Sequence, residues 1–189
     1  MRLSRTFHRA ALGALLGTGT IFVSQQALAA YEFYVTIVGR KQGKFRAETN
    51  NTSRMYKDRI VGTNFSMGIK SPRDAASGLP TGRRSYSQLC FAKEWGAASP
   101  QLYNAASGNE VLSEVTFDFV RQGPSGDEPV YQTIKLTDAT VADIRSTTPA
   151  ATGATQTRAV DEVCFTFKKI TIENKDGKTA FTDDWQATQ

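Results

Sequence analysis

Apolar side chains recur at every second position in several separate stretches of this chain, and this alternation limits the fold more than any other feature. Because successive side chains of a strand point to opposite faces, each stretch predicts a strand with one apolar face. Such strands bury their apolar faces against one another in a β-barrel or a two-sheet sandwich. The clearest alternations are Phe33/Val35/Ile37, Phe65/Met67/Ile69, Val115/Phe117/Phe119, Ile134/Leu136 and Val163/Phe165/Phe167.

The pattern predicts a mainly β domain of about eight strands. Two hairpins are expected at "RQGPSGDEP" (121–129) and "ENKDGKT" (173–179), where Gly, Pro and Asp favour reversal of the chain. Two longer connections, 71–84 and 146–158, are small and polar, and loops of this length are either functional or disordered. The predicted strands span roughly 31–39, 44–48, 59–70, 85–94, 112–121, 130–143, 159–174 and 178–185.

One stretch, "AASPQLYNAASG" at 97–108, interrupts the strands and predicts a short helix. Ser99 can cap its first turn, Pro100 suits the first helical position, and Gly108 suits a left-handed residue after the last turn. One leucine and two alanines fall on the same helical face. The helix is therefore expected to cover an apolar patch that the strands alone would leave exposed.

The first 29 residues have the pattern of a secretory signal peptide. Three arginines precede an apolar run over residues 10–23, and an Ala-Leu-Ala site ends at Ala29. The run is shorter than the roughly 18 residues that a membrane span needs. We therefore predict a signal peptide at 1–29, a single domain at 30–189, a periplasmic or secreted location, and no membrane span after cleavage.

Charge and histidine content exclude several function classes. Loss of the signal peptide would remove three arginines and no acidic residue, so the formal net charge would fall from +5 to +2, which argues against nucleic-acid binding. The single histidine, His8, lies in the same segment, so the processed chain would lack the commonest general base and zinc ligand. We predict no catalytic residues, no cofactor and no metal. A carboxylate pair assembled across strands stays open as a route to glycoside hydrolysis.

The two cysteines, Cys90 and Cys164, both lie in predicted strands, on the face opposite the large apolar residues. Export to an oxidising compartment would permit a disulfide between them. If the two strands are neighbours the bridge is feasible, and if they are apart two half-buried thiols remain. The sequence leaves both alternatives open.

The order of elements resembles the haemolysin-coregulated proteins (Hcp), the family that forms the inner tube of type VI secretion systems. The resemblance covers about residues 31–185 and is most specific in "KEWGAASPQL" (93–102), "VTFDFVR" (115–121) and "EVCFTFKKI" (162–170). It implies a two-sheet β-barrel with one short helix, and six subunits closing into a ring. Stacked rings would form a tube that carries exported effector proteins, with no catalysis. The two long loops would contact neighbouring subunits or rings.

Two alternatives accompany this resemblance. Tube proteins of the family ordinarily lack a cleaved export signal, so a relative that builds rings or tubes on its own, in the periplasm or outside the cell, is an equal alternative. The other is a secreted β-sandwich module that recognises carbohydrate or protein through its long loops and Trp95 or Trp185. The sequence favours packing of both tryptophans at strand ends or against a partner surface instead.

Overall fold

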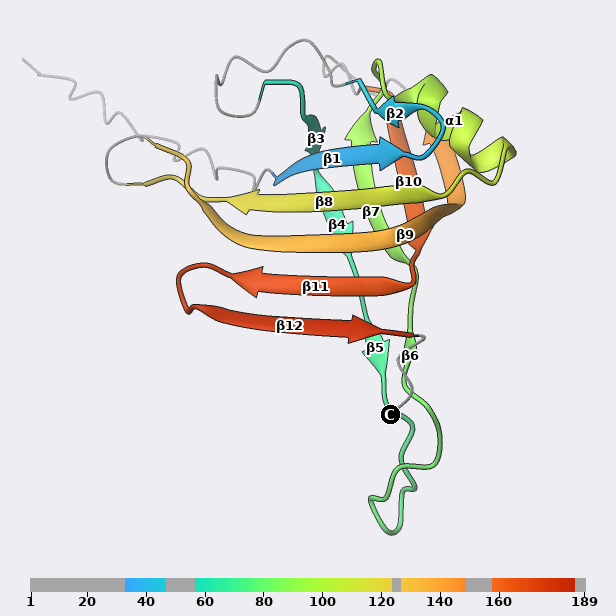
Figure 1. Cartoon of the computed structure of the whole chain (residues 1–189), viewed down its shortest axis with the longest axis vertical. Helices are drawn as coiled ribbons and strands as arrows, with labels where there is room; N and C mark the ends of the chain where they lie inside the picture. Colours follow the sequence, from blue (N-terminus) through green and yellow to red (C-terminus); the bar gives the residue numbers. More distant parts are fainter. Residues whose placement is uncertain (1–32, 47–56, 124–126, 149–157, 186–189) are drawn as a thin grey trace, which may run out of the picture.

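The computed structural model describes residues 33–46, 57–123, 127–148 and 158–185. Within these ranges the chain is mainly β, with one short helix, as the alternation predicts (Figure 1). The predicted signal peptide lies outside the described residues. Among the residues that are described, no helix has the length and apolar character to cross a membrane.

The first sheet is antiparallel and follows the spatial order β1, β8, β9, β11, β12. Two short strands, β2 and β3, pair with different parts of the remaining edge of β1. The bounds are β1 Phe33–Gly39, β2 Gly43–Lys44, β3 Ile60–Gly62, β8 Leu112–Val120, β9 Val130–Thr147, β11 Lys169–Asn174 and β12 Thr179–Asp184.

The second sheet begins on the later half of β9 and continues through β10, β7 and β4. Its further bounds are β4 Asn64–Ser66, β7 Leu89–Glu94 and β10 Val160–Thr166. Because β3 pairs with β1 and the following β4 pairs with β7, these two short strands join the free sides of the two sheets. Thr63, between them, donates its main-chain N–H to Ala92 at 2.9 Å. The shared β9 and this β3–β4 link together close a barrel.

The inward faces of both sheets meet in an aromatic core. Phe91 stacks on Phe165 with ring centroids 5.9 Å apart, and Phe117 meets Phe91 edge-on at 5.6 Å. Phe33 contacts Phe65 edge-on at 5.8 Å. Phe33, Phe65, Phe117 and Phe165 belong to the alternating stretches of the sequence and point inward as predicted, whereas Ile69, expected on the same face as Phe65, is 52% exposed. Aromatic pairs in these arrangements add to the stabilisation that burial supplies.

Three predicted strands, 59–70, 85–94 and 159–174, are broken in the structure. The 159–174 strand is interrupted after Thr166, because β10 pairs with the later half of β9 while β11 pairs with its earlier half. The chain must therefore cross from one sheet to the other. The β9 strand spans both sheets and turns at Asp138, which has a positive φ of 50°. The predicted 59–70 strand is likewise divided, whereas the two predicted hairpins are confirmed by the pairing of β8 with β9 and of β11 with β12.

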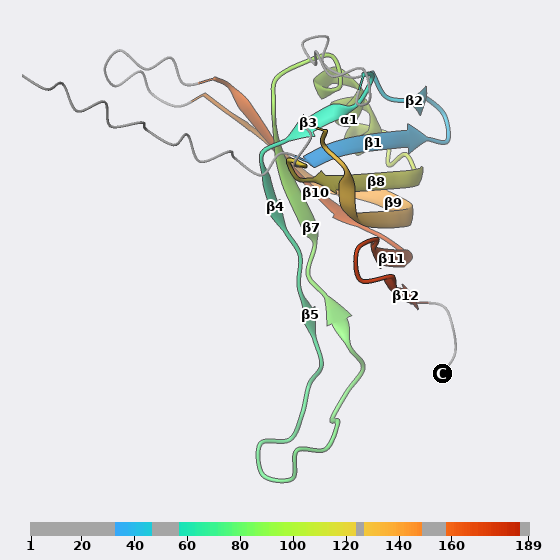
Figure 2. The ribbon, with the colours of Figure 1, turned by 90° about the vertical axis from the view of Figure 1, so that its left-hand side faces the viewer.

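A long hairpin, residues 67–88, projects from the barrel and is called the arm here (Figure 2). It contains β5 Ile69–Lys70 and β6 Ser85–Tyr86, which pair only with each other within the described chain. The tip is ordered by Asp74, whose Oδ1 accepts main-chain hydrogen bonds from Ala76 and Ser77 at 3.1 and 2.7 Å. The arm corresponds to the first of the two predicted long connections. Most of the second connection lies outside the described residues.

Helix α1, Ser99–Ser107, confirms the predicted helix, but its ends correct the predicted caps. The N-cap is Ala98, and Ser99 is already helical because its hydroxyl is held by a buried carboxylate of the barrel. Pro100 lies in the first turn, as expected. At the other end Gly108 has a φ of −89°, and the left-handed residue is Asn109, with a φ of 47°.

Candidate functional site

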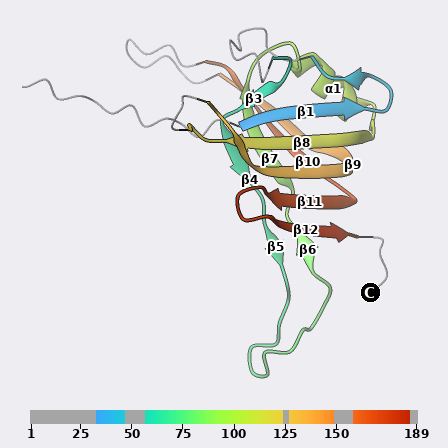
Figure 3. The same cartoon turned by 60° about the vertical axis from the view of Figure 1, so that its left-hand side comes forward.

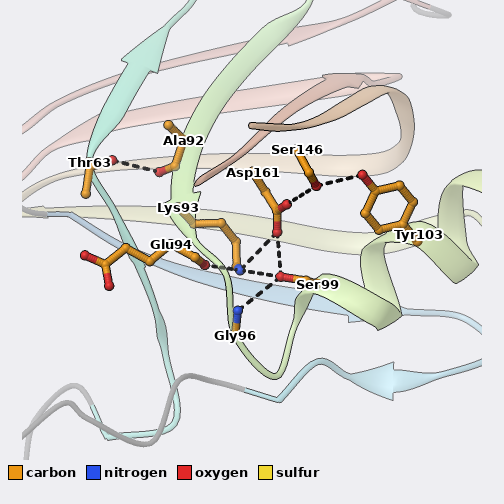
Figure 4. Close-up of polar contacts among 9 residues, drawn as sticks. All are labelled: Thr63, Ala92, Lys93, Glu94, Gly96, Ser99, Tyr103, Ser146 and Asp161. Carbon is orange, nitrogen blue, oxygen red and sulfur yellow. Dashed lines mark hydrogen bonds and ion pairs between the residues drawn. The ribbon is translucent and has the colours of Figure 1, made fainter. Parts of the chain in front are cut away.

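A cluster of polar side chains is buried where helix α1 meets the barrel (Figure 4). Lys93 of β7 and Asp161 of β10 are direct partners in the second sheet, and they are 0% and 1% exposed. Ser99 and Tyr103 come from α1, and Ser146 comes from β9. We call these five residues the polar cluster.

The carboxylate of Asp161 is the centre of the polar cluster. Its Oδ2 accepts a hydrogen bond from Ser99 and lies 3.5 Å from Lys93 Nζ, while its Oδ1 accepts a hydrogen bond from Ser146. Lys93 also donates to Ser99 Oγ at 3.0 Å and to the main-chain carbonyl of the following residue. The hydroxyls of Tyr103 and Ser146 are 2.7 Å apart. Each charged group is therefore paired and hydrogen-bonded, as buried charges require.

The polar cluster anchors the helix to three strands of the barrel. A serine beside a lysine is a pairing that some hydrolases use for nucleophilic attack, which needs access for a substrate. Here the lysine and the aspartate have almost no exposed surface, and the serine hydroxyl is bound to both. The arrangement is suited to holding α1 in place rather than to chemistry on a bound molecule.

A second buried carboxylate ties the turn between β1 and β2 to the helix. Glu110 is 3% exposed and accepts main-chain hydrogen bonds from Lys41 and Gln42 at 2.6 and 2.9 Å. Burial opposes its charge, but the hydrogen bonds from Gln42 and Lys41 outweigh burial and hold the pKa of Glu110 below its usual value. Gly39 is required nearby, because a Cβ there would lie 2.4 Å from Glu110 Oε1.

The root of the arm is fastened to β12 by an ion pair that we call the arm latch, made of Arg84, Tyr86 and Asp183. Arg84 binds both carboxylate oxygens of Asp183, and the Tyr86 hydroxyl donates to Oδ2 at 2.7 Å. The hydrogen bonds from Arg84 hold the pKa of Asp183 below its usual value, against the opposing effect of burial. Burial, followed by the hydrogen bond to Asp183, raises the pKa of Tyr86 to about 12. Asp183 is therefore ionised at neutral pH.

The arm latch should open on acidification. An aspartate whose pKa is lowered by folding stabilises the folded state above its unfolded pKa of about 3.9, and that stabilisation is lost as the pH falls through the folded value. In a Trp95→Phe background, the fluorescence of Trp185, whose ring lies 5.8 Å from that of Tyr86, should therefore change below about pH 4. Asp183→Asn should show the open signal already at pH 7, whereas Asp184→Asn should titrate like the parent. An identical acid transition in Asp183→Asn would contradict this assignment.

Among the described residues, six large apolar side chains are 44–64% exposed, and by position they fall into two groups. The first lies on the arm and β12, and the second lies on and before α1. Trp95 and Trp185 are 53% and 51% exposed, so neither is fully packed within its own chain, and packing against a partner surface stays a prediction. The first group comprises Ile69, Leu79, Phe181 and Trp185, and the second comprises Trp95 and Tyr103.

The two cysteines are joined in the structure. Cys90 and Cys164 lie opposite each other in the paired strands β7 and β10, and their sulfurs form a disulfide. Of the two alternatives that the sequence leaves open, this is the one in which the strands are neighbours. Both side chains point to the outer face of the second sheet, because Leu89 and Val163 beside them fill the interior.

The described residues contain no cluster of side chains that could hold a metal ion. No three side chains of His, Cys, Asp or Glu converge in the parts of the chain that the structure describes. A shallow groove at the corner between β10 and β11 contains Arg40, Asp138 and Lys168. Their charges are already paired, because Asp138 lies 2.6 Å from Arg40 and 3.9 Å from Lys168.

Comparison with known proteins places this fold among secretion components. The sequence profile of the family described as "Type VI secretion system effector, Hcp" matches residues 34–173. A relative named "Major exported protein", from Pseudomonas aeruginosa, is 29% identical over 163 residues, which cover 82% of this chain and 95% of the relative. Among solved structures, "Crystal structure of Hcp protein" aligns with a TM-score of 0.77 and 26% identity, covering 84% of this chain and 100% of that one. "Secreted protein Hcp3 from Pseudomonas aeruginosa" aligns with a TM-score of 0.68 and 25% identity, again covering 84% and 100%.

Proposed function

Because the chain belongs to the Hcp family of type VI secretion proteins, we propose that it is an exported structural subunit that assembles with copies of itself into hexameric rings. The rings stack into a tube that acts as a conduit or carrier for effector proteins. The relative named "Major exported protein" and the signal-peptide pattern at 1–29 support export to the periplasm or beyond. The chain carries out no catalysis in this role.

The exposed, preorganised arm is the main structural support for this proposal. Its tip is ordered by its own hydrogen bonds and exposes Leu79, which is 64% accessible. It also exposes three basic side chains, Lys70, Arg73 and Arg83, and one acidic side chain, Asp74. A preorganised hairpin that the described chain does not cover loses little conformational entropy on binding. Such a segment is suited to contact with a second copy.

A closed ring needs two different patches on each subunit that meet head to tail. The two exposed apolar groups fulfil this condition, because one lies at the arm and the other at helix α1. In all three views the arm and the helix lie at opposite ends of the molecule (Figures 1–3). The arm of one copy can therefore reach a neighbour without competing with the helix of its own subunit.

The outer face of the first sheet has the character expected of a tube wall. A row of small hydroxyl side chains crosses the sheet at Thr36, Thr116, Thr171 and Thr182, interrupted by Lys135. The lysine lies 2.6 Å from Glu114, and this hydrogen-bonded contact holds the pKa of the glutamate below its usual value. Hydroxyls and paired charges bind a passing protein weakly. The face therefore supports passage of cargo rather than its retention.

Light scattering on the purified protein lacking residues 1–29 tests the proposal. We expect a particle about six times the mass of one chain, or larger multiples where rings stack, at micromolar concentration. The mass should not change when the ionic strength is raised, if apolar side chains dominate the contact. A particle with the mass of a single chain at these concentrations would contradict ring formation.

A further inference from the structure

The disulfide lies at the root of the arm. Cys90 is the second residue of β7, and it pairs with Cys164 of β10 on one side and with Ser66, the last residue of β4, on the other. The arm leaves the barrel directly after Ser66 and returns directly before Leu89. The disulfide therefore joins β7 to β10 within one residue of the point where the arm leaves the barrel.

Besides the disulfide, the root is held by short strand pairing and by Met67 and Tyr86, which pack against the barrel core. The β4 strand joins β7 through three residue pairs, and beyond it β5 and β6 pair only with each other within the described chain. Near the root, Ser87 donates its main-chain N–H to the carbonyl of Gly68 at 2.9 Å, which links the two sides of the arm there. The arm latch at Asp183 fastens the arm to β12 as well.

The barrel itself has support that does not depend on the disulfide. The β7 and β10 strands are paired over six residues, from Glu94 opposite Val160 to Leu89 opposite Phe165. Leu89, Phe91 and Val163 on the inward face are at most 1% exposed. Burial on that scale stabilises the barrel whether or not a covalent bond is present on the outer face.

We propose that the Cys90–Cys164 disulfide is a redox-responsive lock on the arm, so that reduction frees the root of the arm while the barrel stays folded. A dithiol reductant transfers two electrons and two protons to the bond, giving two protein thiols and one oxidised reductant. Cys90 is the more accessible partner, since Cys164 is only 8% exposed. Thiolate attack therefore falls on Cys90, and Cys164 is the leaving thiolate.

The lock has a consequence for assembly, which rests on the proposed function. If the arm makes the contact between copies, a loosened root raises the entropy that must be lost on association. Oxidised subunits would then assemble more readily than reduced ones. Assembly would be favoured after export into an oxidising compartment and disfavoured before it.

Hydrogen exchange on the full barrel domain tests the lock independently of assembly. We compare the untreated protein, the protein reduced with dithiothreitol, and a Cys90→Ala/Cys164→Ala variant, with thiol titration to show that the bond has opened. Amides of residues 66–69 and 87–90 are expected to exchange at least about tenfold faster in both open forms. Amides of β8 and of the β11–β12 hairpin should change by less than about threefold.

Three outcomes would overturn the lock. The first is unchanged exchange at the arm root after the thiols are shown to be free. The second is an equal increase in the exchange rate of the β8 amides, which would mean that the disulfide stabilises the whole fold. The third is a bond that dithiothreitol does not open without denaturant. If the oxidised protein proves monomeric but its root responds to reduction, the proposed function fails and the lock stands.

Discussion

Asp161→Ala is expected to lower the free energy of unfolding by about 3–5 kcal/mol, because it leaves the ammonium group of Lys93 buried without its counter-charge. Lys93 is 0% exposed and has no route to solvent. The same change removes the acceptor for the hydroxyls of Ser99 and Ser146, so helix α1 loses its hydrogen bond to β10, and β9 loses one to β10. Equilibrium unfolding in urea, followed by circular dichroism, measures the change.

Two variants separate the charge from the hydrogen bonds. Asp161→Asn keeps a carbonyl acceptor and should also be strongly destabilised if the buried ion pair is the main contribution. Tyr103→Phe removes a hydrogen bond at the exposed rim of the polar cluster and should lower stability by about 1 kcal/mol or less. A loss below about 1 kcal/mol in Asp161→Ala would contradict the anchoring role of the polar cluster.

Shortening the arm is expected to weaken assembly at least about a hundredfold without unfolding the barrel, because a few central side chains supply most of the affinity of an interface. Lys70 and Ser85 are directly paired, so an Asn-Gly turn can join them in place of residues 71–84. Light scattering over a dilution series gives the association constant, and urea unfolding confirms that the barrel is intact. The arm latch loses Arg84 in this variant, so a second variant is needed.

Leu79→Ser supplies that second variant. It leaves the arm latch and the hydrogen bonds of the tip in place while removing the most exposed large apolar side chain of the arm. Its association should weaken by about tenfold or more. Lys178→Ser, on the turn between β11 and β12, is a matched surface change that should leave the association constant unaltered. If the variant with the shortened arm and the parent had the same association constant, the arm would not be part of the interface.

Local patterns in the sequence were sufficient to predict much of the architecture. Inward residues recur at every second position of a strand, as Val115 and Phe117 do in β8. This spacing follows from strand geometry and does not depend on the rest of the fold. The turn residues at 173–179 likewise determine a hairpin locally, and the structure pairs β11 with β12 across it. The short helix is local in the same sense.

Features that depend on distant residues were not predictable in this way. The break after Thr166 follows from which half of β9 each neighbouring strand meets, and the alternation continues on both sides of it. Ser99 does not cap the helix because Asp161, 62 positions away, binds its hydroxyl. The pairing of Cys90 with Cys164 required knowledge of which strands are neighbours.

The polar cluster did have a signal in the sequence. Lys93 follows Leu89 and Phe91 at intervals of two, and Asp161 precedes Val163 and Phe165 in the same way. A charged residue on the apolar face of a strand indicates a buried charge, and two such residues of opposite sign indicate an ion pair. The exposed tryptophans had no comparable signal, because exposure at a strand end depends on what the rest of the chain leaves uncovered.

The central claim is that this barrel assembles with copies of itself into rings. Electron micrographs of the purified protein lacking residues 1–29, under oxidising conditions, test it most directly. The account predicts closed particles with six-fold symmetry and a central opening, some of them stacked end to end. A field of solitary, compact particles without an opening, from a sample whose fold and disulfide are shown to be intact, would contradict it.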